Sequence, residues 1–185
     1  MVNENRVVAL VGMAGSGKSE VAKILERQGF TRVRFGDITD QEIKKRGLAL
    51  NEENERHIRE ILRKELGMAA YAILNRPRID AALKSHPVVA DGLYSWEEYL
   101  YFKNCYPENF VVIAVYASPQ TRYERLSRRE YRPLSPQEAA GRDKAEIENL
   151  NKGGPIAMAD FTIINESTLD ELKQQTEKIL THILN

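Results

Sequence analysis

The segment 12–19 constrains the fold of this chain more than any other feature. It fits the pattern G-x-x-x-x-G-K-[ST], between a β-branched apolar run at 7–11 and a helix-forming stretch at 20–25. Glycines in such a loop let successive backbone N–H groups point at phosphate oxygens, and the helix dipole favours the same anion. The expected phosphate-binding residues are Gly12, Met13, Ala14, Gly15, Ser16, Gly17, Lys18 and Ser19. The sequence therefore predicts a P-loop that binds a nucleotide.

Two residues of this loop, with one aspartate further on, predict the chemistry of Mg·ATP. Lys18 supplies a positive charge for the β- and γ-phosphates, and the Ser19 hydroxyl can ligate Mg²⁺. Asp91 ends the apolar run at 88–90, where a carboxylate can hold Mg²⁺ or its water ligands. The alternative for Asp91 is a turn aspartate before Gly92. Because Gly92 stands where many hydrolytic ATPases have Glu, the pattern favours phosphoryl transfer over hydrolysis.

Short apolar runs alternate with longer amphipathic stretches along the chain. Ser95 with Glu98, and Ser135-Pro136 with Glu138, are typical capping boxes at helix starts. Continuous apolar runs of this length suit strands that are buried on both faces of a parallel sheet. The expected strands lie at 7–11, 31–35, 88–90, 110–115 and 161–164. The order of elements predicts an α/β fold with right-handed crossovers.

Two segments interrupt this alternation. The chain of 185 residues is long enough for one compact domain over 1–185. Residues 37–84 look entirely helical and are too long for one crossover helix, while residues 127–142 are rich in arginine and contain Pro133 and Pro136. We expect the first to be an acceptor-binding insert and the second a lid.

Arginines are dense in and around the expected lid. A guanidinium group matches the equatorial oxygens of a transferring phosphoryl group, and we expect Arg128, Arg132 and Arg142 to reach it. The alternative is a solvated helix face with ion pairs to Glu124 and Glu130. The series comprises Arg122, Arg125, Arg128, Arg129, Arg132 and Arg142.

Asp37 follows the second expected strand, at the sheet edge where ligands collect in α/β proteins. It can accept a proton from an attacking hydroxyl or orient the acceptor. It can equally be the N-cap of a helix over 40–46. The residues alone leave both interpretations open.

A guanine-binding motif of the form Asn-Lys-x-Asp is absent. Asn151-Lys152 begins such a pattern, but Gly154 stands where the aspartate belongs, and the segment does not end an expected strand. A regulatory GTPase is therefore excluded.

The composition limits the partners. Lys plus Arg and Asp plus Glu both number 27, so nothing favours nucleic acid or an anionic membrane, and no apolar run is long enough to span a bilayer. The single cysteine, Cys105, fits a reducing, cytoplasmic setting. We expect a small-molecule acceptor as partner, and a monomer or a homodimer.

The motifs together resemble the nucleoside monophosphate kinase group, which includes adenylate kinases and dephospho-CoA kinases, and they are most similar to the adenylate-kinase-related, dephospho-CoA-kinase-like proteins. Beside the P-loop, the matching pieces are Gly36-Asp37, Gly47-Leu48, Leu66-Gly67-Met68, Asp91-Gly92-Leu93-Tyr94-Ser95, Ala117 to Arg122, Arg142-Asp143 and Asn165-Glu166. The resemblance implies a three-layer P-loop fold with a five-stranded parallel sheet of order 2-3-1-4-5, an acceptor-binding insert and a lid.

Three functions are compatible with these observations. The first is an ATP- and Mg²⁺-dependent kinase that phosphorylates a small anionic acceptor, with a nucleoside or deoxynucleoside monophosphate favoured. The second is a dephospho-CoA-like or other metabolite kinase, since Leu93-Tyr94-Ser95 stands where an adenylate kinase has Phe-Pro-Arg. The third is a slow ATPase that acts as a nucleotide-binding switch.

Overall fold

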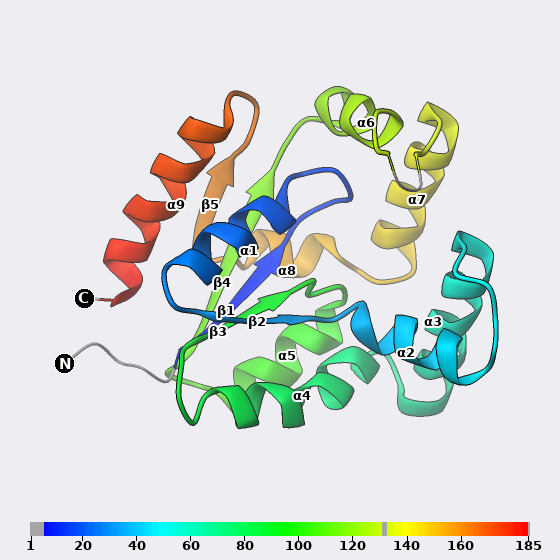
Figure 1. Cartoon of the computed structure of the whole chain (residues 1–185), viewed down its shortest axis with the longest axis horizontal. Coiled ribbons are helices and arrows are strands. Elements are labelled where there is room, and N and C mark those ends of the chain that lie inside the picture. The colour runs from blue at the N-terminus through cyan, green and yellow to red at the C-terminus, as the bar shows by residue number, and fades with distance from the viewer. Residues whose placement is uncertain (1–5, 131–132, 185) are drawn as a thin grey trace.

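A five-stranded parallel sheet forms the centre of the molecule (Figure 1). The computed structural model describes residues 6–130 and 133–184. The strand order is β2-β3-β1-β4-β5, so the expected order 2-3-1-4-5 is confirmed. The strands are β1 (Val7–Val11), β2 (Thr31–Arg34), β3 (Val88–Asp91), β4 (Phe110–Tyr116) and β5 (Phe161–Ile164).

Helices cover both faces of the sheet because successive strand residues point to opposite sides. Val8 and Leu10 of β1 pack against α1 (Lys18–Arg27) and α9 (Leu169–Leu184). Val7, Ala9 and Val11 belong to the second core, on the other face. That face is covered by α4 (Ala70–Ala82), α5 (Trp96–Cys105) and α8 (Gly153–Ala157). The result is the three-layer arrangement expected from the sequence. Within the described residues, no helix is both long and apolar enough to cross a membrane.

The segment 37–84 is helical throughout its length, with short connections, but its helices do two different things. The third helix, α4, packs against β2, β3 and α5 and therefore belongs to the layer that covers the sheet. The first two, α2 (Asp37–Lys45) and α3 (Glu52–Leu66), pack against each other and extend beyond the sheet (Figure 1). They form one wall of the space at the carboxyl ends of the strands.

The arginine-rich segment joins α6 (Pro119–Ser127) to α7 (Pro136–Glu148). The capping box expected at Ser135 is present, since Ser135 Oγ accepts from the Glu138 N–H and the Glu138 carboxylate accepts from the Ser135 N–H. A small third core of Ala14, Leu126 and Ala139 packs these two helices against the P-loop. The second wall of the space is therefore anchored on the loop itself.

A buried ion pair holds the second wall in place. Arg122 of α6 is 4% exposed and donates from both terminal nitrogens to Asp143 of α7, at 2.9 and 2.6 Å. The same guanidinium group donates to the carbonyl oxygens of Ala14 and Ala117, both at 3.1 Å. Arg122 therefore connects α7, the P-loop and the end of β4, and it is a structural arginine.

We expect Arg122→Met to lower the free energy of unfolding by about 3 kcal/mol, because it leaves the buried Asp143 carboxylate without its cation. Urea denaturation followed by circular dichroism measures this change. The double variant Arg122→Met/Asp143→Leu removes both charges and should recover much of the loss. Equal stability of the wild type and the single variant would contradict the assignment.

Candidate active site

The P-loop adopts a conformation that only glycine tolerates at its key positions. Gly12 has φ of 147°, and a Cβ there would lie 2.3 Å from the Val115 carbonyl oxygen. Gly17 has φ of 102°, and a Cβ there would lie 2.1 Å from Asn165 Nδ2. Gly17 is the N-cap of α1, so the first free N–H groups of this ten-residue helix face the loop. The cradle fits the phosphates of a nucleotide.

Lys18 lies across this cradle. Its Nζ donates to the carbonyl oxygens of Gly12 at 2.8 Å and Met13 at 3.0 Å. An ammonium group has three donors, so one donor remains for a phosphate oxygen. Burial and the nearby charge of Lys152 lower the pKa of Lys18 to about 7. An anionic ligand would relieve both effects.

Asp91 stands beside the P-loop because β1 and β3 end at the same level of the sheet. Leu10 and Asp91 are register partners, and the Asp91 side chain is 8% exposed. Its Oδ2 accepts from Arg32 Nε at 3.0 Å and Nη2 at 2.5 Å. Arg32, on the edge strand β2, was not expected from the sequence as a partner of this carboxylate.

The residues present fit Mg²⁺ as a partly hydrated ion. The described residues hold no group of three or more His, Cys, Asp or Glu suited to a metal. Mg²⁺ in nucleotide sites keeps several waters and binds phosphate oxygens with one or two protein ligands. The Ser19 hydroxyl and the Oδ1 atom of Asp91 are the oxygens that would serve it here.

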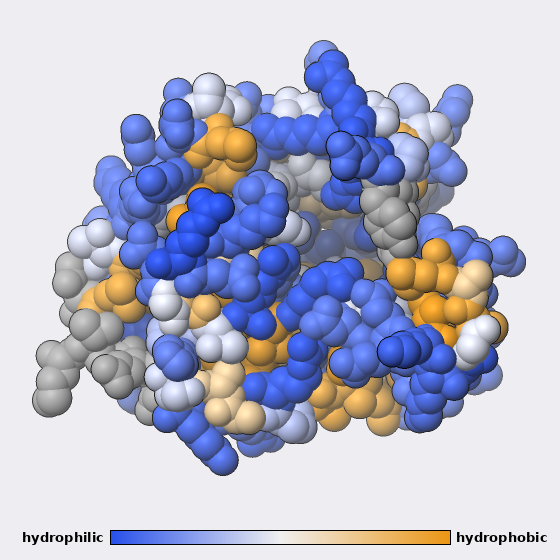
Figure 2. Space-filling view, viewed as in Figure 1, coloured by the Kyte–Doolittle hydropathy of each residue, from blue (hydrophilic) through white to orange (hydrophobic). Residues whose placement is uncertain are grey.

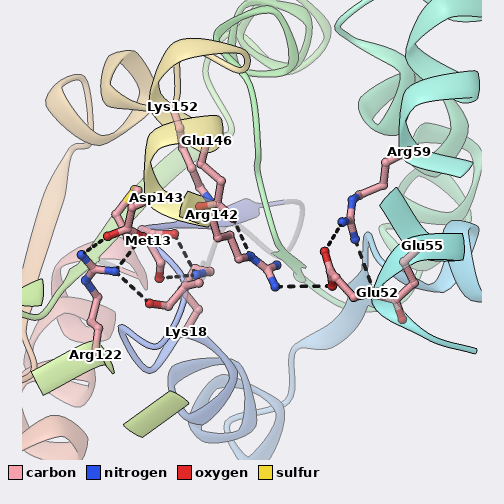
Figure 3. Close-up of polar contacts among 12 residues, drawn as sticks. Met13, Lys18, Glu52, Glu55, Arg59, Arg122, Arg142, Asp143, Glu146 and Lys152 are labelled. Atoms are coloured by element: carbon pink, nitrogen blue, oxygen red, sulfur yellow. Dashed lines mark hydrogen bonds and ion pairs between the residues drawn. The ribbon is translucent and has the colours of Figure 1, made fainter. Parts of the chain in front are cut away.

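A cluster of cations lies next to the P-loop (Figure 3). Glu146 of α7 accepts from Arg142 Nε at 3.2 Å and from Lys152 Nζ at 2.7 Å. Burial disfavours the ionised form of Glu146, but the charges of Lys152 and Arg142 outweigh burial and lower its pKa to about 2. On its far side, Arg142 Nη1 lies 3.9 Å from Glu52 of α3. Together with Lys18, this cluster places three cations around the buried Glu146 carboxylate, and the arrangement suits an anion.

The expected lid arginines lie in different places. Arg142 is brought into the cation cluster, and Arg129 lies near it, since burial and the charge of Arg142 lower the pKa of Arg129. Arg128 is exposed at the C-cap of α6. Arg132 lies outside the described residues. Two of the three arginines that we favoured, Arg128 and Arg142, lie within the described residues. Of these two, the structure brings Arg142 next to the P-loop.

Asp37 is the first residue of α2, and the N-cap is Gly36, so Asp37 does not cap a helix over 40–46. Its carboxylate accepts from Arg34 Nη1 at 3.1 Å and from Arg78 Nη2 at 2.8 Å. This ion pair with Arg78 links α2 to α4 just past the carboxyl end of β2.

The sequence interpretation missed Lys152 and Glu146. Lys152 lies in the Asn-Lys pair that was compared only with a guanine motif. Glu146 is one of several glutamates on α7, and nothing in its spacing marks it as buried. Glu146 and Lys152 are six residues apart, on either side of a helix end. This spacing is the one sign of their pairing in the sequence, and it is a weak sign in a single sequence.

The surface between the two walls is hollowed. Figure 2 shows a recess between the part of the surface over α6 and α7 and the part over α2 and α3, and hydrophilic residues dominate its rim. The P-loop, Asp91 and the cation cluster belong to the elements that surround it (Figure 1). A P-loop at the carboxyl ends of a 2-3-1-4-5 sheet, with helices on both walls, defines a P-loop protein with the kinase-like fold.

Comparisons with known proteins agree with this class and add the family. A model of the family described as "AAA domain" matches residues 8–149. UPF0200 protein TK1334 of Thermococcus kodakarensis is 38% identical over 183 residues, which cover 97% of this chain and 98% of that protein. UPF0200 protein MJ1399 of Methanocaldococcus jannaschii is 35% identical, with 97% of this chain and 91% of that protein covered. The chain belongs to the UPF0200 family.

Solved structures with low sequence identity share the fold. A gluconokinase from Sinorhizobium meliloti 1021 has a TM-score of 0.62 at 16% identity and covers 97% of this chain and 94% of its own. A shikimate kinase from Acinetobacter baumannii, solved with shikimate, has a TM-score of 0.58 at 17% identity, with 97% and 93% covered. These similarities establish the P-loop kinase fold; the nucleoside monophosphate acceptor stays a prediction.

The turn after Asp91 is held by a carboxyl group that titrates in the neutral range. Glu98 accepts from the Tyr94 N–H at 2.7 Å and the Ser95 N–H at 3.4 Å. Burial raises its pKa from 4.5 to about 7, although the charges of Arg63 and Lys152 oppose the rise. At a pH between these two pKa values, Glu98 is therefore protonated in the folded protein and ionised in the unfolded chain.

Because of Glu98, we expect the free energy of unfolding to fall as the pH rises from about 5 to about 7. The variant Glu98→Gln should not show this fall. Melting temperatures at pH 5 and pH 8 measure the effect. The variant should match the wild type at pH 5 and exceed it at pH 8, because glutamine keeps the acceptor oxygen and never ionises. Parallel pH profiles would refute the assigned titration.

Proposed function

We propose that the protein transfers the γ-phosphoryl group of ATP, with Mg²⁺, to a small anionic acceptor. The observation that carries the proposal is the meeting of a glycine cradle, a Lys18 ammonium group with one donor left for a ligand, and the cation cluster at one end of the sheet. Phosphoryl transfer requires positioning and neutralisation of charge on the equatorial oxygens, and these groups supply both. The family membership is compatible with this activity.

Each residue has a distinct task in this proposal. The N–H groups of the P-loop and Lys18 bind the β- and γ-phosphates, Ser19 and Asp91 hold the magnesium ion and its water ligands, and Arg142 neutralises the group in transfer. Magnesium supplies charge neutralisation when it is bound. Arg32 keeps the Asp91 carboxylate oriented through Oδ2.

A nucleoside or deoxynucleoside monophosphate is the acceptor that we favour. Where α3 meets α4, a cation lies against aromatic rings, since the Arg63 guanidinium carbon lies 5.1 Å from the centre of the Tyr71 ring, and Tyr71 packs edge-on against Tyr94. Arg63 Nε is buried and has no hydrogen-bond partner within the described residues. An acceptor phosphate attacks through an oxygen that is already ionised, so no general base is needed. Asp37 would then orient the acceptor through Arg78.

Other metabolite kinases are the second possibility within the same chemistry. The fold neighbours bear the names gluconokinase and shikimate kinase, so small hydroxy acids belong in the test beside dephospho-CoA. With a hydroxyl acceptor, Asp37 would take the proton that the attacking oxygen loses.

The direct test is ADP release from Mg·ATP in the presence of single candidate acceptors: nucleoside and deoxynucleoside monophosphates, dephospho-CoA, gluconate and shikimate. We expect one acceptor class to stimulate release at least roughly tenfold above the basal rate, within the range of ordinary kinase turnover. Slow release that no acceptor changes would oppose the kinase and favour the ATPase switch.

Lys18→Ala should leave the fold intact and reduce transfer by on the order of 100-fold or more, because it removes a charge that is stronger in the transition state. Circular dichroism verifies the fold. The matched control is Lys23→Ala, which removes an exposed lysine on the same helix that pairs with Glu20. An active Lys18 variant would refute the assigned site.

Asp91→Asn should lower Mg²⁺-dependent turnover and shift its half-saturation to higher Mg²⁺ concentration, because it removes the anionic ligand that we assign to the metal. Titration of turnover with Mg²⁺ measures this. An unchanged titration curve would return Asp91 to the role of a turn residue that pairs with Arg32.

A further inference from the structure

Lys152 is a buried lysine whose hydrogen-bonding capacity is incompletely used. Its side chain is 1% exposed, and its Nζ donates to Glu146 Oε2 at 2.7 Å. The ammonium group also lies 5.3 Å from the centre of the Tyr94 ring. Three N–H donors are present, and Glu146 is the one hydrogen-bond acceptor that the described residues offer to Nζ. Burial of unused ammonium donors is unfavourable unless a ligand satisfies them.

The backbone around Lys152 is tightly constrained. Asn151 has φ of 50° and is the one non-glycine residue with positive φ in the described part of the chain. The Lys152 N–H donates to the Glu146 carbonyl oxygen at 3.2 Å, and a Cβ on Gly154 would lie 2.7 Å from Trp96 Cε3. These contacts fix the turn against α7 and α5. Unfavourable backbone conformations of this kind persist where the surrounding structure holds them, often at functional sites.

The two lysines lie near each other: Figure 3 shows the Lys18 and Lys152 side chains in one group with Arg142 and Glu146. In agreement with this, the charge of Lys152 is, after burial, the main influence that lowers the pKa of Lys18. Arg142 shares the Glu146 carboxylate with Lys152, while Lys18 donates to carbonyl oxygens only. Lys152, Arg142 and Lys18 thus all act on one buried carboxylate, Glu146. Such an arrangement favours an anion that lies between the cations.

We propose that Lys152 is a second phosphate-binding lysine, which binds the γ-phosphoryl group of ATP together with Lys18 and Arg142. Glu146 is its positioning residue. The inference rests on the proposed function. In transfer, the bond from the γ-phosphorus to the β–γ bridging oxygen breaks and the bond to an acceptor oxygen forms. Lys152 keeps its proton and donates hydrogen bonds to the non-bridging oxygens throughout.

This role can be separated from a purely structural ion pair by comparing two nucleotides. A lysine that binds the γ-phosphate stabilises the complex with the β,γ-imido analogue of ATP, whereas it contributes little to the complex with ADP. A structural lysine affects both complexes equally, because its loss acts through the fold. The ratio of the two dissociation constants therefore reports the contact without any knowledge of the acceptor.

The first experiment measures both dissociation constants by isothermal titration calorimetry for the wild type, Lys152→Met and Lys144→Met. Lys144 is the matched control, since it also lies near the end of α7 and its side chain is 72% exposed. We expect Lys152→Met to weaken binding of the imido analogue by about 10- to 100-fold and binding of ADP by less than about threefold, as for a lost charge-assisted hydrogen bond. Equal changes for both nucleotides would overturn the proposal.

A double variant covers a loss of folding. Lys152→Met/Glu146→Gln removes both buried charges, and it should keep ADP binding while it lacks selectivity for the imido analogue. Unchanged selectivity of this double variant for the imido analogue over ADP would overturn the proposal. Absence of nucleotide binding in the wild type would instead refute the proposed function.

Discussion

The charge balance among three neighbouring cations is the constraint on which the rest of the active site depends. Lys18, Lys152 and Arg142 converge at the carboxyl ends of β1 and β3, and Glu146 is the buried carboxylate shared by two of them. The cradle glycines, the turn before α8 and the capped start of α7 all serve to hold these charges at short range. A site built in this way is electrostatically incomplete without an anion, and a nucleotide polyphosphate supplies it.

Much of the fold was predictable because its signals are local. The P-loop pattern, the five apolar runs and the capping boxes at Ser95 and Ser135 depend on neighbouring residues, and all of them appear in the structure at the expected places. The strand order came from the resemblance to a family and was not readable from spacing. Sequence also predicted the helical nature of 37–84, but it gave no sign that α4 covers the sheet while α2 and α3 form a wall.

The rest of the site could not be predicted, because it depends on contacts between distant residues. In the sequence, Arg32 is only a charged residue within the expected strand 31–35. The register of β2 and β3 is what brings it to Asp91. The role of Arg122 illustrates the opposite error. It belongs to the arginine series for which we expected phosphate contacts, yet its guanidinium group donates to Asp143 and to two carbonyl oxygens. Periodicity identifies the face on which an arginine lies, but not the carboxylate that it meets.

The two walls of the recess differ in how firmly they are held. On the phosphate side, the ion pairs Arg122–Asp143 and Lys152–Glu146 are buried, so they have few alternative geometries. Between the walls, the contact from Arg142 to Glu52 is 3.9 Å long and partly exposed, and such pairs contribute less than about 1 kcal/mol. Direct contact between the α2–α3 wall and α7 is therefore slight, while Ile43, Ile58 and Leu62 hold that wall to the core on one face of the sheet. A firmly held P-loop side with little direct contact to the opposite wall leaves the recess between them open to a ligand.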